Sequence, residues 1–126
     1  MSKYADKVRE MIALVGKQEL DKVADMYAED GVMEHPSYSD PGLNEARAIQ
    51  GRENIRQAVM TWDKDADVEE TEIYDIMEKD NKVFALWCCT RHNHKTGEKG
   101  KLEVMSYFTF EGELIKNYKV YFDRIE

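Results

Sequence analysis

The stretch MYAEDGVMEHP, residues 26–36, decides the fold of this 126-residue chain. Apolar residues arrive at this stretch with helical spacing, which predicts a helix over Glu19–Glu29, and Gly31 then breaks the pattern. Proline disfavours the helical region for the residue before it, so we expect Val32–His35 to be extended. The stretch is therefore a corner between a helix and a strand, and it ends in His-Pro.

The spacing of apolar residues predicts helices in the first half of the chain and strands in the second half. Apolar spacing predicts a first helix over Tyr4–Val15, ended by Gly16, and a third helix that opens at Gly51 and carries Trp62. Pro41 and Gly42 indicate a loop over Ser37–Asn44. The period then changes to two, which predicts four strands joined by short turns: Val68–Lys79, Lys82–His92, Lys101–Phe110 and Leu114–Arg124.

Helices followed by an antiparallel meander are typical of the α+β class. We expect one domain over residues 1–126, with three N-terminal helices packed on a curved antiparallel sheet. Such a sheet wraps around its helices and leaves a cone-shaped pocket between them. His35 lies at the corner where this pocket would open.

Composition limits the partners. The net charge of −8 favours neither nucleic acid nor anionic lipid as a partner, which leaves a small molecule or a second copy of the chain. No apolar segment is long enough to cross a membrane or to direct export, so we expect a cytoplasmic protein. Cys88 and Cys89 are adjacent in a strand pattern, which favours two reduced core residues over a disulfide.

Two segments resemble a known family. The run over residues 26–36, together with Gly51-Arg52-Glu53-Asn54-Ile55, is similar to the SnoaL-like, ketosteroid-isomerase-like branch of the nuclear transport factor 2-like superfamily. In the isomerases an aspartate base precedes the proline, and a tyrosine and a neutral aspartic acid form the oxyanion hole. Here His35 replaces the base, Met11 the tyrosine, and Ser106 lies near the aspartic acid position. Loss of an oxyanion donor costs about a hundredfold or more in rate, so the resemblance argues against steroid isomerisation.

The C-terminal half resembles a different group, the limonene-epoxide-hydrolase-like proteins. Residues 90–93 and 118–123 carry this likeness. The family uses two aspartates bridged by an arginine, and the resemblance implies that Arg91 and Asp123 are kept while Asn93 replaces the acid. An amide cannot donate a full proton to a leaving oxygen, so epoxide hydrolysis is compromised as well.

Three residues are candidates for catalysis. His35 titrates near neutral pH and could act as acid or base, oriented by Glu34 or Asp123; the alternative is a structural histidine at a strand end. Arg91 and Asp123 are expected on neighbouring strands, where they could position a water or oxyanion or form a merely structural ion pair. We predict no metal site, because His92 and His94 have no third ligand at a diagnostic spacing.

Aromatic and hydroxyl side chains are candidates for ligand contact, with ordinary core packing as the alternative for most of them. They are Tyr27, Tyr38, Trp62, Ser106, Phe108, Tyr118 and Phe122. Phe122 and Asp123 are adjacent in a strand, so only one of them faces the pocket unless a bulge intervenes. The sequence leaves that choice open.

These features predict a small-molecule-binding protein that acts as an isomerase, cyclase or hydrolase by proton transfer, without a cofactor. The alternative is a non-catalytic ligand-binding or dimerisation module on the same fold. We expect a homodimer, because Met105, Tyr107 and Thr109 would form a partly apolar outer surface on the strand that buries Val104, Ser106 and Phe108.

Overall fold

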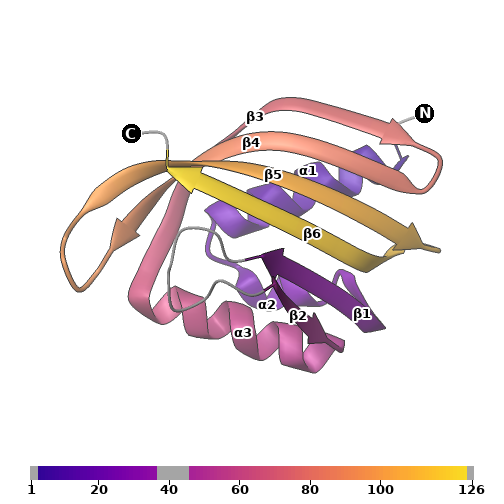
Figure 1. Cartoon of the computed structure of the whole chain (residues 1–126), viewed down its shortest axis with the longest axis horizontal. Helices are drawn as coiled ribbons and strands as arrows, with labels where there is room; N and C mark the ends of the chain where they lie inside the picture. The colour runs from indigo at the N-terminus through magenta and orange to yellow at the C-terminus, as the bar shows by residue number, and fades with distance from the viewer. Residues whose placement is uncertain (1–2, 37–45, 125–126) are drawn as a thin grey trace.

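A computed structural model describes residues 3–36 and 46–124, with side chains over 3–34, 48–60 and 67–121. Its helices are α1 (Lys3–Gly16), α2 (Leu20–Ala24) and α3 (Arg52–Asp65). Its strands are β1 (Tyr27–Pro36), β2 (Ala46–Gln50), β3 (Ala66–Lys79), β4 (Lys82–Asn93), β5 (Lys99–Glu111) and β6 (Leu114–Arg124). The predicted α+β class is confirmed (Figure 1).

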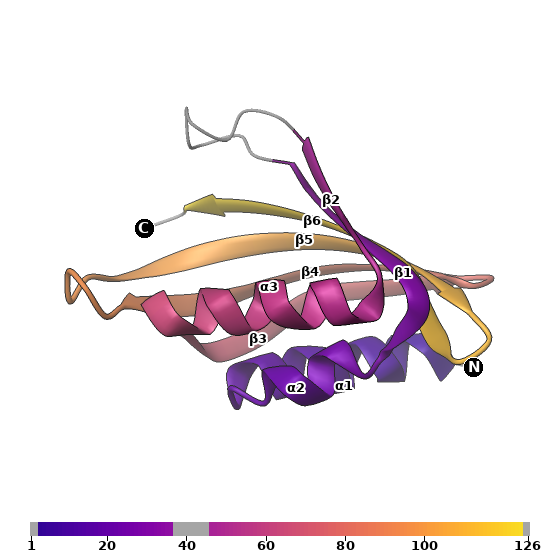
Figure 2. The same cartoon turned by 90° about the horizontal axis from the view of Figure 1, so that it is seen from below.

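The strands form one curved sheet in the order β2-β1-β6-β5-β4-β3. All neighbours are antiparallel except β1 and β6, which run parallel. Figure 2 shows the three helices on one side of this sheet. We call the face toward the helices the inner face and the opposite one the outer face. Strand alternation puts successive residues on opposite faces, so the register decides which side chains meet.

The predicted second helix is wrong in its extent. It ends at Ala24, and Tyr27 already belongs to β1, although the helical spacing of apolar residues continues to that tyrosine. Pairing with the sheet overrides the local period: the Ile115 amide donates to the Met26 carbonyl, and Arg52 Nε donates to the Tyr27 carbonyl. The backbone groups of this segment are thus satisfied by tertiary contacts instead of by a helix.

Gly31 lies inside β1 and does not end a helix. A Cβ atom there would come within 2.9 Å of the Ile115 carbonyl oxygen and 3.1 Å of the Ala28 oxygen. Its own carbonyl accepts a hydrogen bond from the Gly51 amide, which fixes the approach to α3. A glycine is therefore required where β1 bends between its pairings with β6 at Tyr27 and Val32.

The remaining elements agree closely with their predicted bounds, and strand β2 was not predicted. The first helix, the third helix and the four-strand meander are confirmed, while the predicted loop over 37–44 lies outside the described residues. The core lies between the inner face and the helices, where Val8 and Ile12 of α1 and Ile55 of α3 join the buried strand residues. None of the described helices is long and apolar enough to span a membrane.

Candidate functional site

A chain of buried polar groups crosses the inner face of the sheet. Trp87 of β4 donates its indole N–H to Ser106 Oγ of β5 at 3.0 Å, and Ser106 Oγ lies 2.9 Å from the Tyr118 hydroxyl of β6. All three residues are at most 6% exposed. Buried hydroxyls need partners, and these three groups satisfy one another in an otherwise apolar core. We call Trp87, Ser106, Tyr118 and the neighbouring Tyr27 the inner polar cluster.

The register of the meander brings these residues together. Ser106 pairs with Ala85 and Val120, whereas Trp87 pairs with Val104, one row away. Tyr118 pairs with Phe108 and, across the parallel ladder, with Met33. These positions are buried and share one face, because residues that pair directly across strands point the same way.

Tyr27 lies beside this chain but takes no part in it. The residue is 0% exposed, and its buried hydroxyl has no hydrogen-bond partner among the residues whose side chains are described. Its ring centroid is 6.4 Å from that of Tyr118. Burial raises the pKa of Tyr27 well above its usual value, and nearby Tyr118 raises it further. Tyr27 therefore stays a protonated donor.

Tyr118 packs against a neighbouring aromatic ring. Its ring stacks on Phe108 with centroids 4.4 Å apart and planes within 4°. Burial raises the pKa of Tyr118, the hydrogen bond with Ser106 lowers it, and Cys89 raises it again. Phe108, a predicted ligand contact, is 0% exposed and in this structure supports the tyrosine ring.

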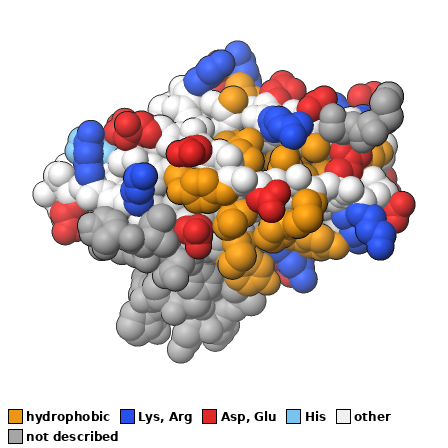
Figure 3. All heavy atoms as spheres, turned by 90° about the horizontal axis from the view of Figure 1, so that it is seen from above, with side chains coloured by type: hydrophobic (Ala, Val, Ile, Leu, Met, Phe, Trp, Pro, Cys, Tyr) orange, Lys and Arg blue, Asp and Glu red, His pale blue; other side chains and the backbone are white. Residues whose placement is uncertain are grey.

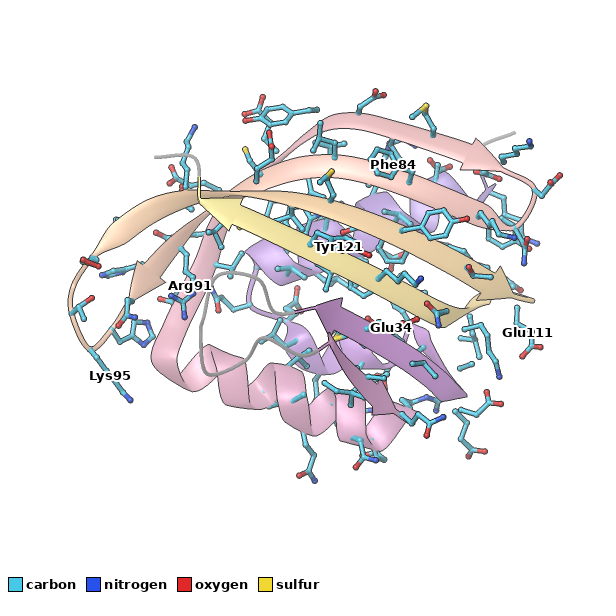
Figure 4. All side chains as sticks on the ribbon, viewed as in Figure 1. Glu34, Phe84, Arg91, Lys95, Glu111 and Tyr121 are labelled. Carbon is cyan, nitrogen blue, oxygen red and sulfur yellow. The ribbon has the colours of Figure 1, made fainter. Side chains whose placement is uncertain are left out.

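Arg91 lies near the C-terminal end of β4. It follows Trp87 and Cys89 by even steps, so strand alternation puts all three on the inner face. Burial raises the pKa of the Cys89 thiol to about 11, with a further rise from Cys88 and a smaller opposing effect of the positive charge of Arg91. Arg91 itself is half-buried and lies toward the hairpin whose tip carries Lys95 (Figure 4).

The expectation that Arg91 and Asp123 lie on neighbouring strands is wrong. Strand β5 separates β4 from β6, Arg91 pairs with Gly100, and Asp123 pairs with Glu103. Phe122 pairs with Val104. Arg91 and Asp123 therefore cannot form a bidentate pair across two adjacent strands.

The catalytic candidate His35 is placed by its backbone alone. It pairs with Arg47 of β2, and it follows Glu34, whose partner on β6 is Lys119. The Glu34 carboxylate accepts a hydrogen bond of 3.0 Å from Asn117 Nδ2 (Figure 4). It was predicted to orient His35 instead. The side chain of His35 lies outside the described residues, and so do those of four other candidates: Tyr38, Trp62, Phe122 and Asp123.

Trp87 is the site residue that sequence reasoning undervalued. It was not among the predicted catalytic or ligand-contact residues. The residues two apart at 85, 87 and 89 and at 104, 106 and 108 predict shared faces. The contact between Trp87 and Ser106 also depends on the register, which the length of the connecting hairpin sets. Among the described residues no group of three or more His, Cys, Asp or Glu side chains could hold a metal ion.

Solved structures share this fold at low sequence identity. A provisionally assigned isomerase from Bacillus subtilis is 19% identical, with a TM-score of 0.85 over 97% of this chain and 87% of that chain. An NTF2-like protein of unknown function from Burkholderia pseudomallei is also 19% identical, with a TM-score of 0.80 over 98% and 92%. A hypothetical protein with a ketosteroid isomerase-like fold from Catenulispora acidiphila, bound to trimethylamine, is 16% identical, with a TM-score of 0.76 over 90% and 82%.

The family is shown by sequence. A comparison with curated proteins gives no match. The predicted resemblance of the C-terminal half to limonene-epoxide hydrolases stays a prediction. A sequence profile of the SnoaL-like domain, however, matches residues 8–118, which cover α1 through most of the meander. The chain belongs to the SnoaL-like family.

Proposed function

We propose that this protein binds a small, largely apolar metabolite between the sheet and the helices and acts on it by proton transfer. The reaction would be that of an isomerase, cyclase or hydrolase without a cofactor. One observation carries the proposal: polar donors are buried on the inner face, where a core needs none. The trimethylamine complex of the Catenulispora protein supports it, because there a chain of this fold is bound to a small molecule.

His35 is the proposed acid or base. Imidazole titrates near neutral pH, so it can accept and return a proton without strong tuning. Its backbone position supports the role. Strand β1 pairs with β6 as far as Glu34 and Lys119. The residue after Lys119 is Val120, which pairs with Ser106 of the inner polar cluster. His35 is thus about one strand step from the row that holds the polar cluster.

Arg91 and Asp123 are proposed to act separately, each positioning a water or a developing negative charge. Arg91 has support from its position on the inner face of β4, an even number of residues from Trp87 and Cys89. The proposed ligand contacts come from both ends of the chain, and the buried hydroxyls are the better supported among them. They are Tyr27, Tyr38, Trp62, Ser106, Phe108, Tyr118 and Phe122.

A second candidate function is a non-catalytic ligand-binding or dimerisation module, and the outer face supports it. Met77, Phe84 and Tyr107 form one row across β3, β4 and β5, and Leu86 and Met105 form the next. We call these five residues the outer apolar patch; Met77 is 56% and Met105 44% exposed. Figure 3 shows hydrophobic side chains gathered among charged ones, and Figure 4 labels Phe84. We propose a cytoplasmic homodimer that buries this patch.

A ligand screen with matched histidine variants tests the proposal. Lactones, epoxides, enones and aromatic acids are added to the protein, and the shift in melting temperature reports binding. His35→Ala should leave the melting temperature of the free protein nearly unchanged and lower the turnover of any accepted substrate by about 10²–10⁴-fold. His92→Ala, at the far end of β4, is the control and should retain turnover. Full turnover by His35→Ala would contradict the proposed role.

A further inference from the structure

The outer apolar patch lies between two rows of opposite charge. At one end Glu72 of β3 and Glu103 of β5 lie in a single row, because each of them pairs with Cys88 of β4. At the other end Lys79 of β3 pairs with Lys82 of β4. We call Glu72 and Glu103 the acidic row, and Lys79 and Lys82 the basic row.

Strand alternation puts both rows on the outer face. Along β4, every second residue shares this face, and these residues are Lys82, Phe84, Leu86 and Cys88. The residues between them, at positions 83, 85 and 87, are buried in the core. In order along the strand, the outer face therefore carries the basic row, the apolar patch and the acidic row. Two residues of an antiparallel strand span about 6.8 Å, so the two charged rows are about 20 Å apart.

Within the described part of the chain, neither row is neutralised. None of the four side chains forms an ion pair with another residue whose side chain is described. Glu72, Lys79 and Lys82 are exposed, and Glu103 is half-buried. The Debye length at physiological salt is about 8 Å, so rows that are about 20 Å apart in one copy attract each other only weakly. Both rows are therefore suited to a partner that presents the reverse order of charge.

We propose that a second copy of the chain packs on this face with its strands reversed, so that the acidic row of each copy lies opposite the basic row of the other. This inference rests on the proposed homodimer and adds its arrangement. The two-fold axis runs across the strands, between the row of Leu86 and Met105 and the row of Phe84 and Tyr107. Rotation about this axis exchanges the two ends of the face, and each charge contact occurs twice.

A two-fold axis along the strands would give the opposite electrostatics. It would bring the acidic row of one copy onto the acidic row of the other, and the basic row onto the basic row. Packed sheets are about 10 Å apart, which two long charged side chains can span. Like charges that face each other across an interface disfavour association and so suppress the wrong arrangement. The order of charge thus selects between two arrangements that bury the same apolar patch.

The apolar surface continues across four strands. Met77 lies at one edge, on β3, and Tyr121 of β6 extends the patch at the other, where it pairs with Met105 and is 40% exposed (Figure 4). Sheets that pack face to face keep their strand directions within about 30° of each other. Whole rows therefore lie opposite each other, and the charged rows meet along their length.

Reversal of each charged row, alone and together, tests the arrangement. The variants are Glu72→Lys/Glu103→Lys, Lys79→Glu/Lys82→Glu and the combination of all four substitutions. Analytical ultracentrifugation of a dilution series measures the dissociation constant of the dimer. Each double variant should raise this constant at least about tenfold, because like charges then face each other twice. The combination reverses both rows and should return the constant to within about threefold of the wild-type value.

Neutral substitutions and salt provide a second test. Glu72→Gln/Glu103→Gln should weaken the dimer less than charge reversal does, and added salt should weaken the wild-type dimer, since both remove an attraction. With the axis along the strands, the same neutral variant would form a tighter dimer. Glu10→Lys on α1, exposed on the helix side of the sheet, is the control and should leave the dissociation constant unchanged.

The outcomes separate this inference from the proposed homodimer. An unchanged or tighter dimer in a double variant, or in the neutral variant if a reversed one fails to fold, would overturn the reversed arrangement and leave the homodimer in place. A combination that dimerises as weakly as the double variants would also overturn it, because the two rows would then not lie opposite each other. A wild-type protein that is monomeric at all concentrations would overturn both proposals.

Discussion

Each face of strands β4, β5 and β6 carries some side chains that its surroundings do not favour. The inner face, packed against the helices, contains the linked donors of Trp87, Ser106 and Tyr118. The outer face exposes Met105 by 44% and Tyr107 by 38%. Trp87, Ser106 and Tyr118 are partners for one another, while the Tyr27 hydroxyl beside them has no partner among the described residues. Exposed apolar side chains on a surface are typical of interaction sites. This contrast is the ground for the proposals of a ligand on the inner face and a second copy of the chain on the outer face.

The largest expected effect is a loss of stability when a side chain packed on the inner face is truncated. Phe108→Ala removes a fully buried ring that stacks on Tyr118, so it should lower the free energy of unfolding by about 3–5 kcal/mol. The neighbouring Tyr107→Ala, on the outer face, should cost less than about 0.5 kcal/mol in the monomer. Urea denaturation at low protein concentration measures both. Similar losses for the two variants would mean that the faces are not distinct.

Removal of the hydroxyl at the centre of the cluster should have an intermediate effect. Ser106→Ala leaves the Trp87 N–H and the Tyr118 hydroxyl without their shared partner and should cost about 1–3 kcal/mol. Thr109→Ala on the same strand is the control, with an expected change within about 0.5 kcal/mol. Denaturation under identical conditions compares them, and an unchanged stability in Ser106→Ala would contradict the linked cluster.

Alkaline pH should act through the inner tyrosines. The folded pKa of Tyr27 and Tyr118 is raised above the unfolded value of 10.0, chiefly by burial. Above that value the unfolded chain loses these protons while the native chain keeps them, so stability is complete below pH 10 and falls as pH rises. Each group contributes a slope of about 1.4 kcal/mol per pH unit. Tyr27→Phe and Tyr118→Phe should each reduce the slope between about pH 10 and 12, and an unreduced slope would contradict their burial.

A charge introduced into the outer apolar patch should weaken the proposed homodimer. Met105→Glu places a carboxylate in the proposed interface and should raise the dimer dissociation constant at least about tenfold, or about 1.4 kcal/mol. Analytical ultracentrifugation across a dilution series measures it. Lys95→Glu at the exposed hairpin tip is the control. A monomeric wild-type protein at all concentrations would contradict the homodimer.

Much of the fold is predictable from the sequence because its signals are local. The change from period 3.6 to period 2 after α3, and short turns such as Asp80-Asn81, are sufficient for four of the six strands. The second helix was predicted too long, because Tyr27 fits a helical stripe but pairs with Ile115 of β6. Parallel pairing between the beginning and the end of the chain leaves no local pattern from which to predict it.

The site is less predictable, because it depends on register. Ser106 and Tyr118 were candidates by resemblance and by residue type, and the structure links them by a hydrogen bond. The role of Trp87 as a donor follows from where side chains meet across strands, and so does the lack of a partner for Tyr27 within the described part of the chain. A single sequence contains no record of those contacts. The roles of His35, Arg91 and Asp123 stay predictions.

The position of a bound ligand is tested most directly by methyl NMR of methionine. The protein has seven methionines; Met11 and Met33 lie in the core on the inner side, whereas Met77 and Met105 lie exposed on the outer face. With ¹³C-methyl-labelled methionine, titration with a ligand found in the screen of lactones, epoxides, enones and aromatic acids should shift the Met11 and Met33 resonances in a saturable way and leave those of Met77 and Met105 in place. Shifts confined to Met77 and Met105 would contradict a ligand site between the sheet and the helices.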